Sequence, residues 1–229
     1  MKIKCPYLSQ FPSLKHGFFE AVPETLSSER TQAMTALAGR LLPMARLKQV
    51  HGCKVIHITD LCDQEKEGDG LVTTLKGISL WVSTADCGPV LFYDPVAEVI
   101  GACHAGWRGA KGGILQATLD SMEAMGAKRS QIYATLGPTI QQENYEVGPE
   151  FPDLINEPYE LYFYPSEKSE HHYFNLPYYI SQQLINEELS KVHDMGLDTF
   201  TGNFASRRRF LSQHKKKISS DNLSAIAIV

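Results

Sequence analysis

Residues 98–136 constrain the fold more than any other part of the sequence, because they predict a strand, a glycine turn, a helix and a second strand in succession. Residues 98–103 form an apolar run, and residues 104–113 then contain four glycines. The i, i+3, i+4 spacing of an amphipathic helix follows, in Ile114, Leu115, Thr118, Leu119, Met122 and Met125. Gly126 stands where a left-handed helix end is expected, and residues 131–136 return as a strand. Such a unit favours an α/β fold with at least some parallel strand pairing.

The remaining sequence adds strands and two helices to this unit. Apolar and β-branched runs predict further strands at residues 54–58, 78–82, 90–93 and 223–229. Helices are predicted at residues 24–40 and from Leu176 to about Asp194, the second with Asn175 as its N-cap. Residues 141–173 show only weak periodicity, so we expect a short helix and loops there.

Composition and length exclude several classes of protein. The chain has 22 basic and 26 acidic residues, a net charge of −4, which gives nucleic acid no general attraction. No apolar stretch approaches the roughly 20 residues of a membrane-spanning helix, and the first residues lack the apolar core of a signal peptide. We therefore expect a cytoplasmic protein without a membrane partner. No repeat or linker divides the 229 residues, which predicts one domain over residues 1–229.

Five cysteines at uneven spacings, without a C-x-x-C pair, predict free thiols. Two charged clusters are expected to face water. The first is acidic and its spacing fails the calcium-loop pattern, in Asp60, Asp63, Glu65, Glu67 and Asp69. Asp69 differs from the others because Gly68 and Gly70 flank it, which would let its carboxylate approach a ligand. The second cluster, Arg207–Arg209 with Lys215–Lys217, lacks the interleaved aromatic residues of a nucleic-acid surface.

Three short polar segments, residues 48–52, 84–89 and 104–109, each fall at a predicted strand end or turn, where a rigid scaffold presents functional groups. They contribute His51, Cys87 and His104. Two imidazoles and a thiolate suit zinc, and a set of three protein ligands leaves the fourth position of a catalytic site to water. Without a metal, Cys87 could act as a nucleophile with His104 as its base, as in cysteine hydrolases. Both interpretations require the Cys87 thiolate.

The glycine turn also has two interpretations. Gly106, Gly109, Gly112 and Gly113 surround Arg108 at a predicted helix start. Backbone N–H groups, the helix dipole and a guanidinium would together hold a phosphate or a carboxylate. Alternatively, the glycines allow the helix to pack closely and Arg108 faces water.

Five ordered motifs together strongly resemble the YfiH family, also called the laccase-domain or polyphenol oxidase family and, in some bacteria, the peptidoglycan editing factor. The motifs are Lys48–Gly52, Gly68–Gly70, Thr84–Cys87 with Pro89 and Val90, His104–Gly109, and Leu136–Pro138 followed by Tyr145–Gly148. The resemblance implies a single α/β domain of mixed β-sheets flanked by helices. It also implies a zinc ion bound by His51, Cys87 and His104.

The resemblance further implies a purine nucleoside enzyme, which phosphorolyses adenosine, inosine or methylthioadenosine and deaminates adenosine. Zinc would lower the pKa of a bound water toward about 7 for deamination. For phosphorolysis, we expect Arg108 and the glycine turn, including Gly109, to hold the phosphate. Gln49 or Asp69 would orient the nucleoside, and Asp86 would support the metal ligands. The expected partners are therefore a nucleoside and phosphate, with the chain a monomer or a homodimer.

Other functions stay open at this point. The peptidoglycan editing name suggests a cytosolic amide hydrolase acting on muropeptide precursors, and a binding module without efficient catalysis is a third possibility. A multicopper oxidase would require most of the eight histidines. Four of them fall outside every matched motif, namely His171, His172, His193 and His214. The two imidazoles and the thiol could nonetheless bind a single copper ion in vitro.

Overall fold

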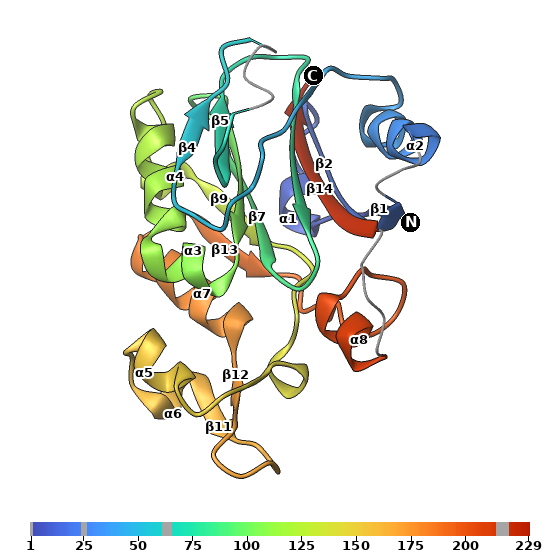
Figure 1. Cartoon of the computed structure of the whole chain (residues 1–229). Helices are drawn as coiled ribbons and strands as arrows, with labels where there is room; N and C mark the ends of the chain where they lie inside the picture. Colours follow the sequence, from blue (N-terminus) through green and yellow to red (C-terminus); the bar gives the residue numbers. More distant parts are fainter. Residues whose placement is uncertain (1, 24–26, 61–65, 214–219) are drawn as a thin grey trace.

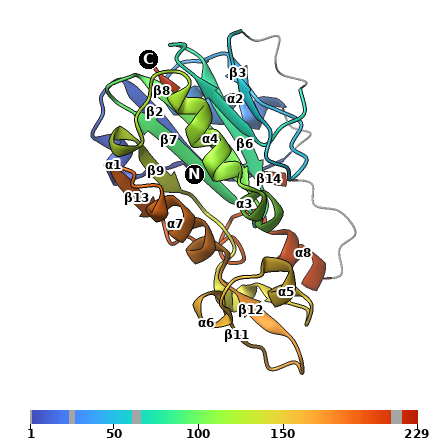
Figure 2. The same ribbon diagram turned by 90° about the vertical axis from the view of Figure 1, so that its left-hand side faces the viewer.

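Two β-sheets stack face to face and helices cover both outer faces (Figures 1 and 2) in the computed structural model, which describes residues 2–23, 27–60, 66–213 and 220–229. The predicted α/β fold of mixed sheets flanked by helices is confirmed. None of the described helices is both long enough and apolar enough to cross a membrane.

The six-stranded sheet contains the unit predicted from residues 98–136. Its order is β13-β9-β7-β8-β5-β4. The strands are β4 (Val55–His57), β5 (Gly70–Thr73), β7 (Gly88–Asp94), β8 (Val99–Ala105), β9 (Tyr133–Leu136) and β13 (Lys191–Asp194). Strand β7 is antiparallel to both β8 and β9, so these two strands run in the same direction on either side of it. Direct parallel pairs occur between β4 and β5 and between β9 and β13.

The five-stranded sheet has the order β1-β2-β14-β6-β3. Its strands are β1 (Lys2–Ile3), β2 (Leu14–Pro23), β3 (Met44–Ala45), β6 (Ser79–Thr84) and β14 (Ser220–Ile228). The strand predicted at the C-terminal end of the sequence is β14, which pairs antiparallel with β2 on one side and β6 on the other. Strand β2 was not predicted, although it is the longest strand described.

The helices complete the two outer layers. They are α1 (Pro6–Ser9), α2 (Ser27–Ala38), α3 (Trp107–Gly112), α4 (Ile114–Glu123), α5 (Phe151–Ile155), α6 (Tyr159–Tyr162), α7 (Leu176–Asn186) and α8 (Arg207–Ser212). Short 3₁₀ turns lie at Arg129–Gln131 and Gln142–Asn144. Helices α4 and α7 pack on the six-stranded sheet, while α2 packs on the five-stranded sheet (Figure 1).

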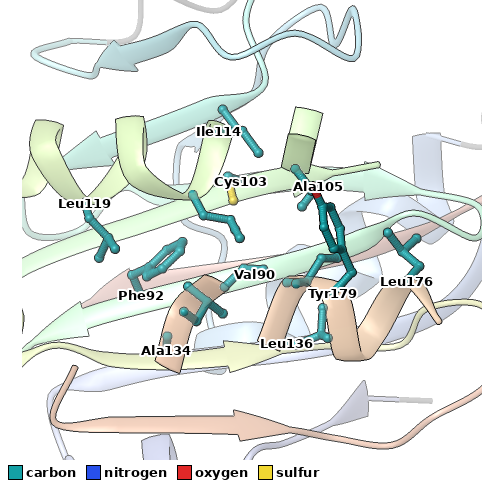
Figure 3. Close-up of a cluster of buried hydrophobic side chains, with 14 of the residues drawn as sticks. Val90, Phe92, Cys103, Ala105, Ile114, Leu119, Ala134, Leu136, Leu176 and Tyr179 are labelled. Carbon is teal, nitrogen blue, oxygen red and sulfur yellow. The ribbon is translucent and has the colours of Figure 1, made fainter. Parts of the chain in front are cut away.

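Successive side chains of a single strand pack alternately into two different buried layers. In β7, Val90 and Phe92 pack toward α4 and α7, whereas Leu91 packs toward the five-stranded sheet. Figure 3 shows Phe92 close to Leu119 of α4 in the first of these layers. Successive side chains of a strand point to opposite faces. The apolar runs predicted at residues 90–93 and 98–103 therefore lie in β7 and β8, which are buried on both faces.

The helix predicted from Leu176 ends earlier than expected. Asn175 is its N-cap, as predicted, and its side chain accepts a hydrogen bond from Tyr178 N at 3.0 Å. The helix stops at Asn186 because Glu188 adopts a positive φ of 55°. Residues 191–194 then pair with β9 instead of continuing the helix. Gly196, expected just after the helix, follows this strand.

Residues 141–173 contain more structure than the short helix and loops expected. They supply β10 (Glu146–Val147) and β11 (Phe163–Pro165), and most of β12 (His172–Phe174). These strands form a separate three-stranded sheet, which lies with α5 and α6 at the lower end of the molecule in Figure 1. Its aromatic side chains pack on one another, with Phe163 and Phe174 ring centroids 5.0 Å apart. Aromatic packing, rather than strand alternation, holds this region, which explains the weak periodicity.

Several sequence predictions lie partly outside the described residues, among them residues 24–26 of the first predicted helix, Cys62, Asp63, Glu65, His214 and Lys215–Lys217. Four cysteines are described, and all four are free thiols as predicted. Glu67, from the acidic cluster, is exposed and pairs with Lys48 at 2.8 Å.

Candidate metal centre and the adjoining hollow

Three side chains from distant parts of the sequence converge at one end of the central strands of the six-stranded sheet. His51, Cys87 and His104 each offer one ligand atom, and the three atoms lie within 4.8 Å of one another. Within the described residues, no other set of His, Cys, Asp and Glu side chains converges in this way. The predicted spatial convergence of these three residues is therefore present.

Strand pairing explains why the three residues meet. His104 lies in β8 and pairs with Pro89 of β7, which brings Cys87, two residues earlier, close to the imidazole. His51 lies in the loop before β4 and has a positive φ of 61°. Its ring meets the ring of His104 edge to face, with centroids 4.7 Å apart.

Asp69 holds the His51 loop and His104 together. Its carboxylate lies 2.8 Å from His104 Nδ1 and accepts hydrogen bonds from His51 N at 3.0 Å, Gly52 N at 2.7 Å and Val50 N at 3.2 Å. The side chain is fully buried, so a nucleoside cannot reach it. Asp69 therefore does not orient a nucleoside, as the sequence suggested, but holds the ring of His104 through Nδ1.

The contact with Asp69 also fixes the tautomer of His104. A carboxylate can only accept hydrogen bonds, so Nδ1 carries the proton and Nε2 is left to face Cys87. A histidine that donates one ring N–H to a carboxylate and presents the other nitrogen is the common arrangement at metal sites.

Electrostatics in this cluster favour the Cys87 thiolate. Burial alone would raise the pKa of Cys87, but hydrogen bonds from His104 and His51, and their charge, lower it to about 7. Burial disfavours the protonated His104 ring, whereas Asp69 and Cys87 raise the pKa of His104 to about 9. The thiolate that both sequence interpretations require is thus accessible near neutral pH.

The donor set fits a zinc ion. Two imidazole nitrogens and one thiolate sulfur are the ligand types that zinc prefers, at bond lengths of about 2.0–2.3 Å. Donors separated by at most 4.8 Å can reach one ion with small shifts of the side chains. His51 is exposed while His104 is buried, so the cluster is open on the His51 side. The residues present therefore fit a catalytic metal site with one side open to the adjoining hollow.

The glycines after His104 serve close packing. Strand β8 leads directly into α3, and Gly113, with a φ of 95°, joins α3 to α4. A Cβ atom on Gly106 would lie 2.8 Å from Cys87 Sγ, and one on Gly112 would lie 2.5 Å from Cys53 Sγ. Gly109 is buried against the backbone of Gly52, so it does not line a ligand site as the sequence suggested. Close packing, the second interpretation of the glycine turn, therefore describes these residues.

Gln49 and Asp86 have partners other than those expected. The Gln49 amide donates to Ser83 O at 2.7 Å and accepts from Ser83 N at 2.8 Å, so it joins its own loop to β6 rather than facing a nucleoside. Asp86 accepts hydrogen bonds from Thr199 Oγ1 and from Arg208 N, both at 2.7 Å. Its carboxylate is therefore bound to the C-terminal part of the chain, whereas that of Asp69 contacts His104.

A hollow of about 350 Å³, here called the inner hollow, opens beside His51 and Cys87. Its lining also includes Ala85, Asp86, Trp107, Arg108, Ile140, Tyr145, Leu176, Arg207, Arg208 and Leu211. A second hollow of about 460 Å³, the outer hollow, shares four of these residues. The shared residues are Trp107, Arg108, Tyr145 and Arg208. The volumes of both hollows are within the range of small-molecule sites.

The shared wall consists of two arginines, each over an aromatic ring. The Arg108 guanidinium lies 4.4 Å from the Trp107 ring centroid, and that of Arg208 lies 5.4 Å from the Tyr145 centroid. Burial raises the pKa of the Tyr145 hydroxyl, so this group stays protonated and can donate a hydrogen bond. Sequence reasoning gave no role to Tyr145 and placed Arg207 and Arg208 in solvent, whereas only Arg207 is exposed and Arg208 is half-buried. The signal it missed was the position of this arginine run after the buried pair Phe204 and Ala205.

Comparison with known proteins gives a consistent set of relatives. The model of a family described as multi-copper polyphenol oxidoreductase laccase matches residues 13–224. A purine nucleoside phosphorylase of Deinococcus radiodurans is 44% identical over 126 residues, 55% of this chain and 49% of that protein. The purine nucleoside phosphorylase RC0672 of Rickettsia conorii is 33% identical over 191 residues, 80% of this chain and 77% of that protein. The adenosine deaminase RL5 of an unknown prokaryotic organism is 42% identical over 112 residues, 45% of this chain and 43% of that protein. The chain thus matches about half the length of two of these relatives.

Solved structures share the fold. The YfiH protein of Bacillus licheniformis superposes with a TM-score of 0.79 at 23% identity, over 94% of this chain and 93% of that one. The protein NMB0706 of Neisseria meningitidis superposes with a TM-score of 0.80 at 24% identity, over 100% of this chain and 98% of that one.

Proposed function

Since the chain belongs to the YfiH family, whose matching model is described as multi-copper polyphenol oxidoreductase laccase, we propose that it is a zinc-dependent purine nucleoside enzyme. Its substrates would be adenosine, inosine or methylthioadenosine with phosphate, and it would also deaminate adenosine. The observation that carries this proposal is the convergence of His51, Cys87 and His104 beside the inner hollow. Relatives named purine nucleoside phosphorylase and adenosine deaminase support it.

His51, Cys87 and His104 would hold the zinc ion, with Asp69 orienting His104 from behind. When bound, zinc supplies a Lewis acid that polarises a substrate oxygen or lowers the pKa of water. The donor set argues against a multicopper oxidase. Within the described residues, these three side chains form one cluster of potential metal ligands, and no second cluster of this kind is found.

The walls of the inner hollow suit a flat base and an anion. The Trp107 and Tyr145 rings offer aromatic surface for a purine. The protonated Tyr145 hydroxyl can donate a hydrogen bond to a nitrogen of the departing base, which gains electron density as the glycosidic bond breaks. Arg108 is exposed at the entrance, where its guanidinium can hold a phosphate beside the sugar.

One observation favours a second function, an amide hydrolase such as an enzyme that edits muropeptide precursors. Cys87, His104 and Asp69 have the relative placement of a nucleophile, a base and an orienting carboxylate, and the Cys87 pKa of about 7 suits a nucleophile. In this alternative His51 would act only by helping to lower the Cys87 pKa. The amide hydrolase therefore predicts activity that survives zinc removal and that loss of His51 reduces only through a higher Cys87 pKa.

Incubation of the zinc-loaded protein with adenosine, with and without phosphate, tests the proposal. Release of adenine and ribose phosphate only when phosphate is present would show phosphorolysis, and inosine would show deamination. A Cys87→Ala variant prepared in the same way controls for contaminating enzymes. Absence of both products from the zinc-loaded protein would reject the proposal.

The role of Arg108 has its own test. The Arg108→Ala variant should raise the KM for phosphate by about 10- to 100-fold, since a charge-assisted hydrogen bond is lost. Its zinc content should equal that of the unaltered protein, because Arg108 contacts none of the three ligands by hydrogen bond. An unchanged KM for phosphate would remove Arg108 from the anion site.

A further inference from the structure

Helix α8 places Arg208 in the lining of the inner hollow, which His51 and Cys87 of the metal cluster also line. Arg208 is half-buried, and its guanidinium lies over the Tyr145 ring. Among the described residues, no carboxylate or carbonyl oxygen accepts a hydrogen bond from this guanidinium. The next residue differs, because the Arg209 guanidinium donates to Phe200 O, Gly202 O and Phe204 O. Arg209 therefore stabilises the loop, whereas Arg208 keeps its N–H donors for another partner.

Arg108, which lines both hollows as Arg208 does, has the same property. Its guanidinium lies over Trp107, and no acidic side chain within the described residues pairs with it. Both arginines line the inner hollow, and both lie near the Tyr145 hydroxyl, whose pKa their charges lower against the effect of burial. Two guanidinium groups without anionic partners thus face a single hollow.

Asp86 is the only acid among the described residues lining the inner hollow, and its carboxylate is already occupied. One oxygen accepts from Thr199 Oγ1, and the other accepts from Arg208 N at the start of α8. Its carbonyl oxygen accepts from Thr139 Oγ1 at 2.8 Å and Ile140 N at 3.0 Å. A non-glycine residue with a φ of 92° persists only where several contacts fix it. Asp86 therefore ties α8 to the turn that carries Cys87.

We propose that Arg108 and Arg208 form the two halves of one phosphate site, and that Asp86 is the positioning residue that holds the Arg208 half next to the metal cluster. This inference rests on the proposed function for the reaction that it serves. Two guanidinium groups can each donate two parallel hydrogen bonds, which matches the tetrahedral set of oxygens of a phosphate dianion. A single carboxylate has only two oxygens, which are too few to give each of the four hydrogen bonds from two guanidinium groups its own acceptor atom.

Direct binding of inorganic phosphate to the zinc-loaded protein, measured by calorimetry, tests the site. Arg208→Ala should weaken binding by about 10- to 100-fold, comparably to Arg108→Ala, because each removes charge-assisted hydrogen bonds. Arg46→Ala, which removes an exposed arginine outside both hollows, should bind phosphate like the unaltered protein. Phosphate binding by Arg208→Ala equal to that of Arg46→Ala, or no phosphate binding by the unaltered protein, would overturn the site.

The positioning role of Asp86 predicts a different pattern. Asp86→Ala should raise the KM for phosphate by about tenfold through loss of the Arg208 N contact. It should keep its zinc, and its KM for adenosine in deamination without phosphate should rise less than its KM for phosphate. Asp86→Asn should restore most of the phosphate affinity, since an amide oxygen can accept from Arg208 N while the amide nitrogen donates to Thr199. Equal effects of the two variants, or joint loss of zinc and phosphate affinity in Asp86→Ala, would overturn the positioning role.

These measurements separate this inference from the proposed function. Phosphate binding that depends on Arg208, in a protein that releases neither base nor inosine, would support the phosphate site and reject the nucleoside reaction. Nucleoside phosphorolysis that is insensitive to Arg208 would support the proposed function and reject the second half of the phosphate site.

Discussion

The two sides of the inner hollow are held in place by different means. On the metal side, His104 lies within a central pair of strands, and fully buried Asp69 fixes the loop that carries His51. On the arginine side, Arg208 belongs to the six-residue helix α8, none of whose residues is buried. We therefore expect the metal side to be disrupted only when the sheets unfold, whereas helix α8 on the arginine side can unfold locally. Changes to the two sides should have separable effects on metal affinity, global stability and phosphate binding.

The largest effect is expected from Asp69 on the metal side. Asp69→Ala would leave three backbone N–H groups and His104 without their buried acceptor. We expect the free energy of unfolding to fall by about 3–5 kcal/mol and zinc affinity to fall by about 10- to 100-fold. Thermal unfolding and the zinc content after dialysis against a zinc buffer measure the two quantities.

Asp86→Ala is the matched control, because it also replaces an aspartate by alanine, but this aspartate binds Arg208 N on the arginine side. It should keep its zinc, since Asp86 contacts Thr199 and Arg208 rather than the metal ligands. Similar zinc loss in both variants would mean that the two sides are not independent.

Low pH should reduce the free energy of unfolding through a histidine in the five-stranded sheet, and not through a residue of α8. Burial lowers the pKa of His16, in β2, to about 4, and its Nε2 accepts a hydrogen bond from Cys5 N at 2.9 Å. The unfolded chain binds a proton near pH 6.5, so the free energy of unfolding falls as the pH drops from about 6.5 to 4. The loss contributed by His16 is about 3 kcal/mol, and it is absent above pH 6.5.

Denaturant unfolding across this pH range measures the effect, with His16→Gln as the control. The variant should lose the part of the pH dependence that corresponds to about one proton. Identical pH slopes for the two proteins would show that the pKa of His16 is the same in the folded and unfolded states, which contradicts the expected shift.

A smaller effect is expected at Gly106, whose backbone lies close to the Cys87 thiol. A Cβ atom on Gly106 would lie 2.8 Å from Cys87 Sγ, so Gly106→Ala must displace the thiol or α3. We expect a stability loss of about 1–3 kcal/mol, together with weaker zinc binding. Gly52→Ala is a suitable control, because its Cβ would meet nothing closer than 3.6 Å. Zinc titration of both variants compares them, and equal affinities would contradict the close packing at Gly106.

The convergence of His51, Cys87 and His104 could be predicted from the sequence, and the position of Arg208 beside them could not. Motifs around His51, Cys87 and His104 signal their chemistry locally, and apolar strands on either side bring them together. Asp69 was noticed through its flanking glycines, but its partner depends on the pairing of β5 with β8, which local sequence does not specify. The direction in which Arg208 points depends on a hydrogen bond to Asp86, 122 positions away. The same limit explains the early end of α7, because residues 191–194 gain a partner strand only in the folded sheet.

The smallest effect tests whether α8 moves alone. Ser206 is the N-cap of α8, and its Oγ accepts from Arg209 N at 3.1 Å. Ser206→Ala should cost about 1 kcal/mol, which corresponds to roughly fivefold faster hydrogen exchange in α8. If α8 opens locally, this cost appears in the exchange of residues 207–212 and leaves the exchange of β7 and β8 unchanged. If α8 instead unfolds only with the sheets, amides of α8 and β8 should exchange at the same rate in the unaltered protein. Hydrogen exchange followed by mass spectrometry distinguishes the two outcomes, and uniform exchange would contradict the independence of the two sides.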